Sequence, residues 1–221
     1  MFWRAREDKR LTAREMDRPI NLAVLISGGG TTLQNLIDKI AAGDLKARVQ
    51  VVISSTSKAF GLERARKHNI PTAVVRRKDF ADDEAFSAAI TAALDRYPVD
   101  LVILGGFLKF WKMPPKYKGR VMNIHPALIP AFCGQDFYGH HVHEAVLASG
   151  VKVSGCTVHF ADNAYDHGPI IIQRTAPVLD DDTPDTLAKR VFEQECIAYP
   201  EAIRLFAEGR LSVVARRVVI R

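Results

Sequence analysis

Two polar residues near the middle of the chain, Asn123 and His125, have the types and spacing needed to act on one small target. A single apolar residue separates them at the end of a run that predicts a buried strand, so both side chains project to the same side of an extended segment. An amide and an imidazole that converge in this way can donate hydrogen bonds to a developing oxyanion. Pro126 also favours an extended conformation of His125. A histidine satisfied inside the core fits the same pattern, and both interpretations stay open at this point.

A carboxylate further along the chain, Asp166, is a candidate partner for this pair. It lies in a turn that precedes another apolar run, starting at Pro169. A carboxylate beside His125 would orient the imidazole or keep it charged. An ordinary turn aspartate explains the residue more simply. The pairing is therefore a hypothesis that the spacing permits and does not require.

The stretch from Ser27 to Thr32 contains three consecutive glycines between a predicted buried strand and a predicted helix. Glycines permit close backbone approach, and the helix start presents free N–H groups. Together they form a cradle suited to a phosphate. The stretch is neither a Walker A loop, since no lysine precedes the threonines, nor a G-x-G-x-x-G fingerprint, since Leu33 occupies the sixth position from Gly28. A tight turn without a ligand is the alternative.

Three histidines cluster at His140, His141 and His143, with Asp136 nearby. Their spacing matches no recognised metal-ligand set, so we favour a polar loop leading into a helix over a metal site. The sequence contains no G-x-S-x-G segment, so it gives no indication of a serine hydrolase.

The cysteines are few and widely spaced, which argues against a disulfide framework and a structural zinc site. We expect all of them to be reduced thiols buried as small hydrophobic residues: Cys133, Cys156 and Cys196.

Around these residues, apolar runs alternate with segments of helical periodicity. This alternation predicts βαβ units and an α/β fold with a doubly wound, mostly parallel sheet, Rossmann-like in its first half. The predicted strands are 20–26, 49–54, 72–76, 99–104 and 120–124, with helices at 33–40, 60–68 and 82–97.

The second half of the chain is more irregular and predicts an antiparallel element. A long loop at 125–139 precedes a short helix at 143–148, and two strands at 153–160 and 169–175 follow. A helix at 184–207 begins with Thr183 as its cap and Pro184 in the first helical position. We expect a charged N-terminal arm at 1–19 and a single domain at 20–221.

Composition limits the classes of protein further. The 221 residues are 48% hydrophobic and carry a net charge of +6, much of it at the two ends of the chain. No aromatic-interleaved basic motif accompanies that charge, so nucleic-acid binding is not expected. Apolar runs are too short to cross a bilayer, and no secretory signal is apparent. We therefore expect a cytoplasmic protein with no membrane partner.

With these residues in hand, the chain resembles the folate-dependent glycinamide ribonucleotide formyltransferases of the formyltransferase superfamily. The resemblance covers about residues 20 to 213. It depends on the combination and order of several segments, of which 59–65 (AFGLERA) is quite specific and 123–130 (NIHPALIP) is shared across the superfamily. The other segments are 24–30, 158–160, 166–171, 194–195 and 198–200.

The resemblance implies a formyltransferase fold, 10-formyltetrahydrofolate as co-substrate, a glycinamide ribonucleotide acceptor and no metal. It implies that the partners are small molecules only, and it is compatible with a homodimer. By their match to the family's motifs, the catalytic residues are Asn123, His125 and Asp166. The acceptor and its phosphate are assigned to Gly30, Thr31, Thr32 and Glu195. The folate is assigned to Leu108, Lys109, Phe110, Trp111 and Asn123, with the loop 161–166 around the pterin.

Several positions depart from the family's pattern. Thr31 and Thr32 stand where serine and asparagine are usual, and Lys109 where arginine is common. Asp83 occupies a position that often carries a folate-contacting arginine, so that contact is not transferred. The stretch 133–143 is several residues longer than usual. These departures concern acceptor specificity and folate affinity.

Other members of the superfamily provide the competing hypotheses. A methionyl-tRNA formyltransferase would need a further C-terminal domain, and a formyltetrahydrofolate deformylase a regulatory domain in front, so neither is expected. A formyltransferase acting on an amino-sugar nucleotide would use the same three catalytic residues. From a different class, a non-catalytic nucleotide-binding module would use the glycine stretch alone.

Overall fold

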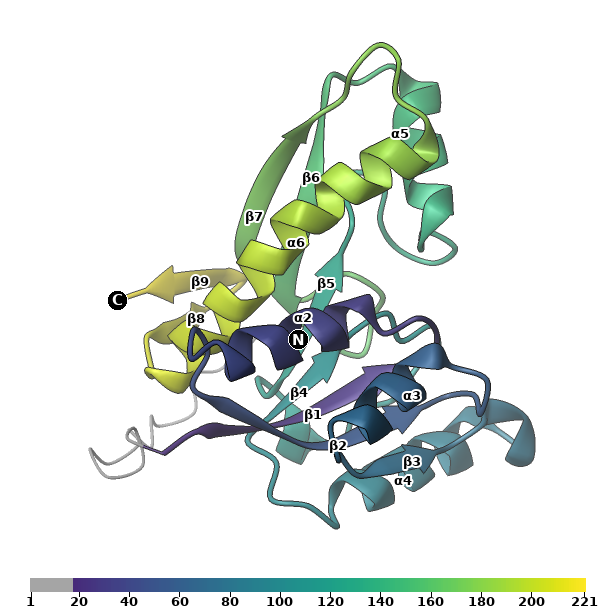
Figure 1. Ribbon diagram of the computed structural model, residues 1–221, viewed down its shortest axis with the longest axis vertical. Helices are drawn as coiled ribbons and strands as arrows, with labels where there is room; N and C mark the ends of the chain where they lie inside the picture. The colour runs from purple at the N-terminus through teal and green to yellow at the C-terminus, as the bar shows by residue number, and fades with distance from the viewer. Residues whose placement is uncertain (1–17) are drawn as a thin grey trace. The chain divides into compact units, whose positions relative to one another are not determined.

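The computed structural model describes residues 18–221 (Figure 1). The predicted N-terminal arm lies outside the described residues except for its last two positions. The described chain divides into two compact units, 19–123 and 124–221. That residues 20–221 form a single domain stays a prediction.

The first unit contains a parallel sheet whose strands match the predicted ones closely. Their order is β3-β2-β1-β4-β5, and every pairing among them is parallel. The central strand β1 is buried on both faces, as its continuous apolar run predicts. The strands are β1 (Ile20–Ile26), β2 (Ala47–Ser54), β3 (Thr72–Val74), β4 (Leu101–Leu104) and β5 (Val121–His125). The last two residues of β5, Ile124 and His125, fall in the second unit.

Helices connect these strands and cover the sheet. They are α2 (Thr31–Ala41), α3 (Phe60–Lys67) and α4 (Asp83–Leu94). Right-handed crossovers place α2 and α3 on one face, because β1, β2 and β3 progress in one direction, and α4 on the other, because the chain then returns to β4. The strand order reverses between β1 and β4. Folds of this kind bind ligands at such a reversal.

The second unit contains the antiparallel element that the sequence predicts. Strands β6 (Val153–Phe160) and β7 (Ile170–Pro177) pair antiparallel. The helix α6 (Pro184–Ala207) packs along both strands (Figure 1). Its N-terminus has the predicted cap: the Thr186 N–H donates to the Thr183 hydroxyl, and the Thr186 hydroxyl returns a bond to the Thr183 carbonyl.

Several elements differ from the sequence prediction. The helix α5 (His140–Ser149) begins at His140, so the three clustered histidines lie on the helix and not in a loop before it. A terminal hairpin of β8 (Leu211–Val214) and β9 (Arg217–Ile220) was not predicted, because its strands are short, largely exposed and interrupted by charges. Short 3₁₀ turns also occur at Arg77–Asp79 and Pro115–Tyr117.

Within residues 18–221, no helix combines the length and the apolar composition that crossing a membrane requires.

Candidate active site

His125 ends β5 in a closed environment. Its side chain is only 3% exposed. The ring Nε2 lies 2.7 Å from the Phe132 carbonyl oxygen, which can only accept, so Nε2 carries the proton and donates it. The other ring nitrogen, Nδ1, lies 3.4 Å from Oδ2 of Asp166. The structure thus brings together the histidine and the carboxylate that are 41 positions apart in the sequence.

Asp166 is held by three partners. The Gly134 N–H donates to its Oδ2 at 2.9 Å, His125 approaches the same oxygen, and Nε2 of His159 lies 3.6 Å from Oδ1. Its backbone has a φ of 50°, in the left-handed region that a non-glycine residue adopts at some cost. Asp166 thus lies in a turn, as predicted, and its carboxylate is largely buried against histidines.

Burial and neighbouring groups shift the pKa values of both members of this pair. Burial lowers the pKa of His125, and Asp166 and the Phe132 carbonyl oppose that shift without reversing it. Burial alone would raise the pKa of Asp166, but His159, His125 and the Gly134 N–H outweigh it, so this pKa is lowered. The resting site holds a charged carboxylate facing the unprotonated Nδ1 of a neutral imidazole. From the sequence, Asp166 could either orient the imidazole or keep it charged, and the lowered pKa of His125 favours orientation in the resting site.

Sequence reasoning did not foresee that two further histidines, His143 and His159, are buried near this pair. His159 is 1% exposed on β6, and its Nδ1 donates to the Phe160 carbonyl at 3.0 Å. His143 on α5 is also buried, and its Nδ1 has no hydrogen-bond partner among the described residues. Burial, with smaller effects of His140 and His125, lowers the pKa of His143 to about 4. The residues around each histidine give no local signal of a site. Only long-range packing shows that these histidines lie near the pair and not elsewhere in the core.

Two of the clustered histidines on α5 lie beside acidic side chains. Among residues 18–221, no group of three histidines, cysteines, aspartates or glutamates is placed to hold a metal ion. His140 instead lies 3.6 Å from Asp185, and His141 lies 3.3 Å from Glu144.

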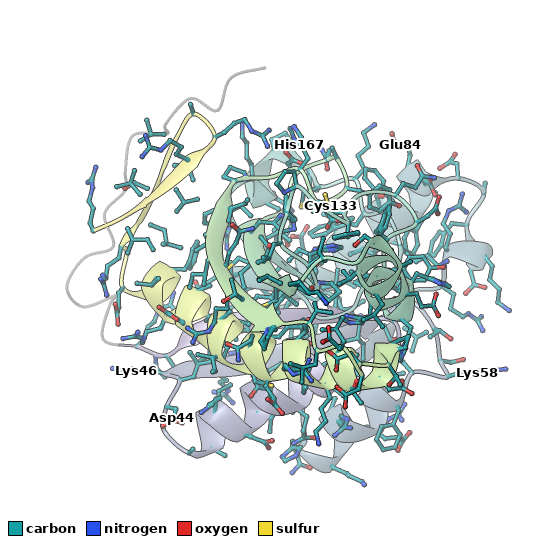
Figure 2. The ribbon with its side chains drawn as sticks, turned by 90° about the horizontal axis from the view of Figure 1, so that it is seen from above. Asp44, Lys46, Lys58, Glu84, Cys133 and His167 are labelled. Atoms are coloured by element: carbon teal, nitrogen blue, oxygen red, sulfur yellow. The ribbon has the colours of Figure 1, made fainter. Side chains whose placement is uncertain are left out.

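Within residues 18–221 the cysteines form no disulfide, but only one of them is buried as expected. Cys156 on β6 is buried, whereas Cys133 and Cys196 are partly exposed. Cys133 precedes the glycine that contacts Asp166, in the irregular loop between β5 and α5, and is labelled in Figure 2.

In the first unit, the glycine stretch forms the turn between β1 and α2. Gly30 has a φ of 69°, and a Cβ there would lie 2.6 Å from the Cα of Gly61. A Cβ on Gly28 or Gly29 would meet nothing within 4 Å, so this part of the turn is open to an approaching group. α2 begins at Thr31 with no side-chain cap and no acidic residue in its first turn. Its N–H groups and its dipole are therefore available to an anion.

The segment after β4 lies beside this turn. The Ser27 N–H donates to the Gly106 carbonyl at 3.0 Å, and the Leu108 N–H donates to the Ser27 hydroxyl at 2.9 Å. The two segments therefore meet at the point where the strand order reverses. Leu108 and Lys109 are exposed there, and Phe110 is partly exposed.

Other predicted binding residues are placed differently. Trp111 is 5% exposed and donates its indole N–H to the Thr91 hydroxyl, so its side chain belongs to the core around α4. Thr31 is exposed, whereas Thr32 is buried near Gly105. Glu195 lies on α6, where burial raises its pKa to about 7. Asn123 is partly buried in β5, two residues before His125.

The described residues thus contain two candidate sites in an α/β fold: an uncapped helix start after an open glycine turn, and a buried histidine–aspartate pair. Residues 20–203 match the family model described as "Formyl transferase". The chain is 38% identical to the phosphoribosylglycinamide formyltransferase of Haemophilus influenzae over 192 residues, 86% of this chain and 88% of that protein. The chain therefore belongs to the phosphoribosylglycinamide formyltransferase family.

Two further relatives show how far this likeness extends. A crystal structure of glycinamide ribonucleotide transformylase 1 from Symbiobacterium toebii has a TM-score of 0.85 and 42% identity, covering 97% of this chain and 98% of that one. The trifunctional purine biosynthetic protein adenosine-3 of Drosophila melanogaster is 40% identical over 209 residues. This chain spans 15% of the length of that longer relative.

Proposed function

We propose that the protein transfers the formyl group of 10-formyltetrahydrofolate to the amine of glycinamide ribonucleotide, a step of de novo purine biosynthesis. The amine nitrogen attacks the formyl carbon, and the bond from that carbon to the folate N10 breaks. One proton leaves the amine and one reaches N10, so the products are tetrahydrofolate and the formylated amide. The observation that carries the proposal is the buried His125–Asp166 pair at the end of β5.

Asn123, His125 and Asp166 form the catalytic set in this proposal. The amide of Asn123 donates to the oxyanion of the tetrahedral intermediate, and His125 stabilises that oxyanion through the positive charge it gains on protonation, because its Nε2–H is already donated to the Phe132 carbonyl. The resting imidazole is neutral, and its unprotonated Nδ1 faces the Asp166 carboxylate at 3.4 Å. A proton released by the attacking amine can therefore be held at Nδ1, where Asp166 stabilises the resulting positive charge. No metal ion takes part.

The remaining residues bind the two substrates. Gly30, Thr31 and Thr32 hold the acceptor's phosphate at the start of α2, where Thr31 adds an exposed hydroxyl and Thr32 contributes its backbone N–H. Glu195 contacts the acceptor. The folate is bound by the segment 108–111 and by Asn123. Because the side chain of Trp111 is buried, it anchors this segment and leaves the contacts to Leu108, Lys109 and Phe110.

An amino-sugar nucleotide is the second candidate acceptor. The observation that favours it is that the segment 133–143, which is longer than in the family that the sequence resembles, carries Gly134, a partner of Asp166. A non-catalytic nucleotide-binding module is disfavoured, because phosphate binding by the glycine turn does not require a buried histidine–aspartate pair. We also propose a cytoplasmic location and small-molecule partners without nucleic acid or membrane. A homodimer stays a prediction, which sedimentation analysis tests.

The deciding experiment measures tetrahydrofolate release by the purified protein with glycinamide ribonucleotide as acceptor. We expect turnover that depends on both substrates and is lost in a His125→Ala variant. Turnover with an amino-sugar nucleotide but not with glycinamide ribonucleotide would refute the acceptor and retain formyl transfer. Full activity of the His125→Ala variant would refute the catalytic set.

A further inference from the structure

The loop that carries Asp166, residues 161–168, is closed at its base. The Phe160 N–H donates to the Pro169 carbonyl at 2.9 Å. A Cβ on Gly168 would lie 1.7 Å from the Phe160 carbonyl oxygen, so only glycine fits there. These contacts fix where the loop leaves and rejoins β6 and β7. They do not explain what holds the residues inside the loop, between its two ends.

One contact inside the loop joins its two ends. Nδ1 of His167 lies 2.9 Å from Oδ2 of Asp162, and the Ala164 N–H donates to Oδ1 of the same carboxylate. Both His167 and Asp162 flank the stretch that contains Asp166. His167 is exposed and is labelled in Figure 2.

Arg216 contacts this loop from the end of the chain, 49 positions beyond His167. Its Nη2 donates to the His167 carbonyl at 2.8 Å, and its Nη1 lies 2.7 Å from Nε2 of the His167 ring. A guanidinium can only donate, so Nε2 accepts and the ring proton is on Nδ1, where it is donated to Asp162. The three side chains thus form one continuous series of hydrogen bonds across the loop.

The terminal hairpin positions Arg216 for this contact. Arg216 lies in the turn between β8 and β9. The next residue, Arg217, begins β9 and pairs with Ile170 of β7, and the two strands run parallel. Ile170 lies three residues after His167. The strand pairing therefore delivers the guanidinium to the loop, independently of any attraction between the side chains.

We propose that Arg216 is a positioning residue that holds the 161–168 loop in the conformation in which the Asp166 carboxylate reaches His125. Arg216 binds the carbonyl of the residue immediately after Asp166, whose own left-handed backbone conformation persists only where the surroundings support it. As a further residue for formyl transfer, it rests on the proposed function. Arg216 is exposed, so its effect is one of alignment and is smaller than that of a catalytic group.

The test compares three variants: Arg216→Ala, Arg216→Lys, and Arg217→Ala as the matched control. Arg217 is the neighbouring exposed arginine of the same hairpin. We expect Arg216→Ala to lower kcat about threefold to tenfold with KM for the acceptor unchanged, because alignment and not binding is lost. Arg216→Lys should recover part of kcat, since an ammonium can still donate to the His167 carbonyl. Arg217→Ala should match the wild type.

Two measurements that need no turnover accompany the kinetics. Hydrogen exchange of the amides in 161–168 should be faster in Arg216→Ala than in Arg217→Ala. NMR titration should show a lower pKa of His125 in Arg216→Ala, because Asp166 supports protonation of that ring. The charged and titratable groups that face His125, namely Asp166, His159 and His143, are unchanged in these variants.

The outcomes separate this inference from the proposed function. If the wild type shows no formyl transfer, the proposed function fails, and loop exchange with the His125 titration still decides whether Arg216 positions Asp166. If the wild type is active and Arg216→Ala equals Arg217→Ala in kcat and in the His125 titration, the inference is overturned by itself. Faster loop exchange with an unchanged kcat and His125 pKa would also overturn it.

Discussion

The glycine turn of the first unit and the His125–Asp166 pair of the second are built in different ways. The turn is made of backbone: Gly30 adopts a positive φ, and α2 starts with uncapped N–H groups. The pair is made of side chains from distant segments, with His159 and Gly134 as additional partners. The first arrangement follows from local residue types, whereas the second depends on burial and long-range contact. Substitutions should therefore affect the two regions through different quantities.

The largest expected effect is on catalysis, in the second unit. His125→Ala and Asp166→Asn should each lower kcat by about 10²–10³, because each removes a group that stabilises the charge developed in the transition state. Steady-state kinetics with both substrates measure this loss. Loss of folding instead of activity, detected by circular dichroism, would show that the pair is structural and would remove the contrast between the regions.

The glycine turn should respond to substitution through stability. Gly30→Ala should lower the free energy of unfolding by about 1–3 kcal/mol, because of its positive φ and because its new Cβ would lie 2.6 Å from Gly61. Urea denaturation measures this difference. Gly29→Ala is the matched control, since its Cβ meets nothing within 4 Å. It should keep the stability and raise KM for the acceptor, because it obstructs the open side of the turn.

The buried histidines should make the second unit sensitive to acid. Burial lowers the pKa of His143 to about 4, below its unfolded value near 6.5. Its stabilising contribution is thus fully present above pH 6.5 and is lost as the pH falls towards 4. Between pH 6.5 and pH 4, the free energy of unfolding of a His143→Gln variant should fall by about 1–3 kcal/mol less than that of the wild type. Urea denaturation at several pH values measures this difference. Parallel curves for the two proteins would contradict this assignment.

The smallest expected effect concerns Glu195, whose pKa burial raises to about 7. A raised carboxyl pKa favours the folded state below the unfolded value near 4.3, and this advantage is lost as the pH rises to 7. Glu195→Gln should therefore melt at a higher temperature than the wild type at pH 8. If Glu195 binds the acceptor as a carboxylate, wild-type KM should rise about threefold to tenfold as the pH falls from 8 to 6. KM of the Gln variant should stay flat with pH.

Much of the fold could be predicted from local patterns. The continuous apolar run of β1, the helical periodicity of α2 and the Thr183–Pro184 start of α6 appear in the structure where the sequence placed them. The hairpin of β8 and β9 could not be predicted, because its strands are short and depend on pairing with β7. The start of α5 at His140 was also missed, since consecutive histidines give no clear helix signal.

Residue types and chain order alone determined the parallel α/β architecture, the open glycine turn and the candidate pair of Asn123 and His125, because strand periodicity and glycine conformation are local properties. Tertiary structure decided the rest. It placed Asp166 against His125 and His159, buried His143 within reach of His125, and lowered the pKa of the His125 imidazole. Desolvation and contacts between distant segments set these properties, and neither is encoded within any short stretch of the chain.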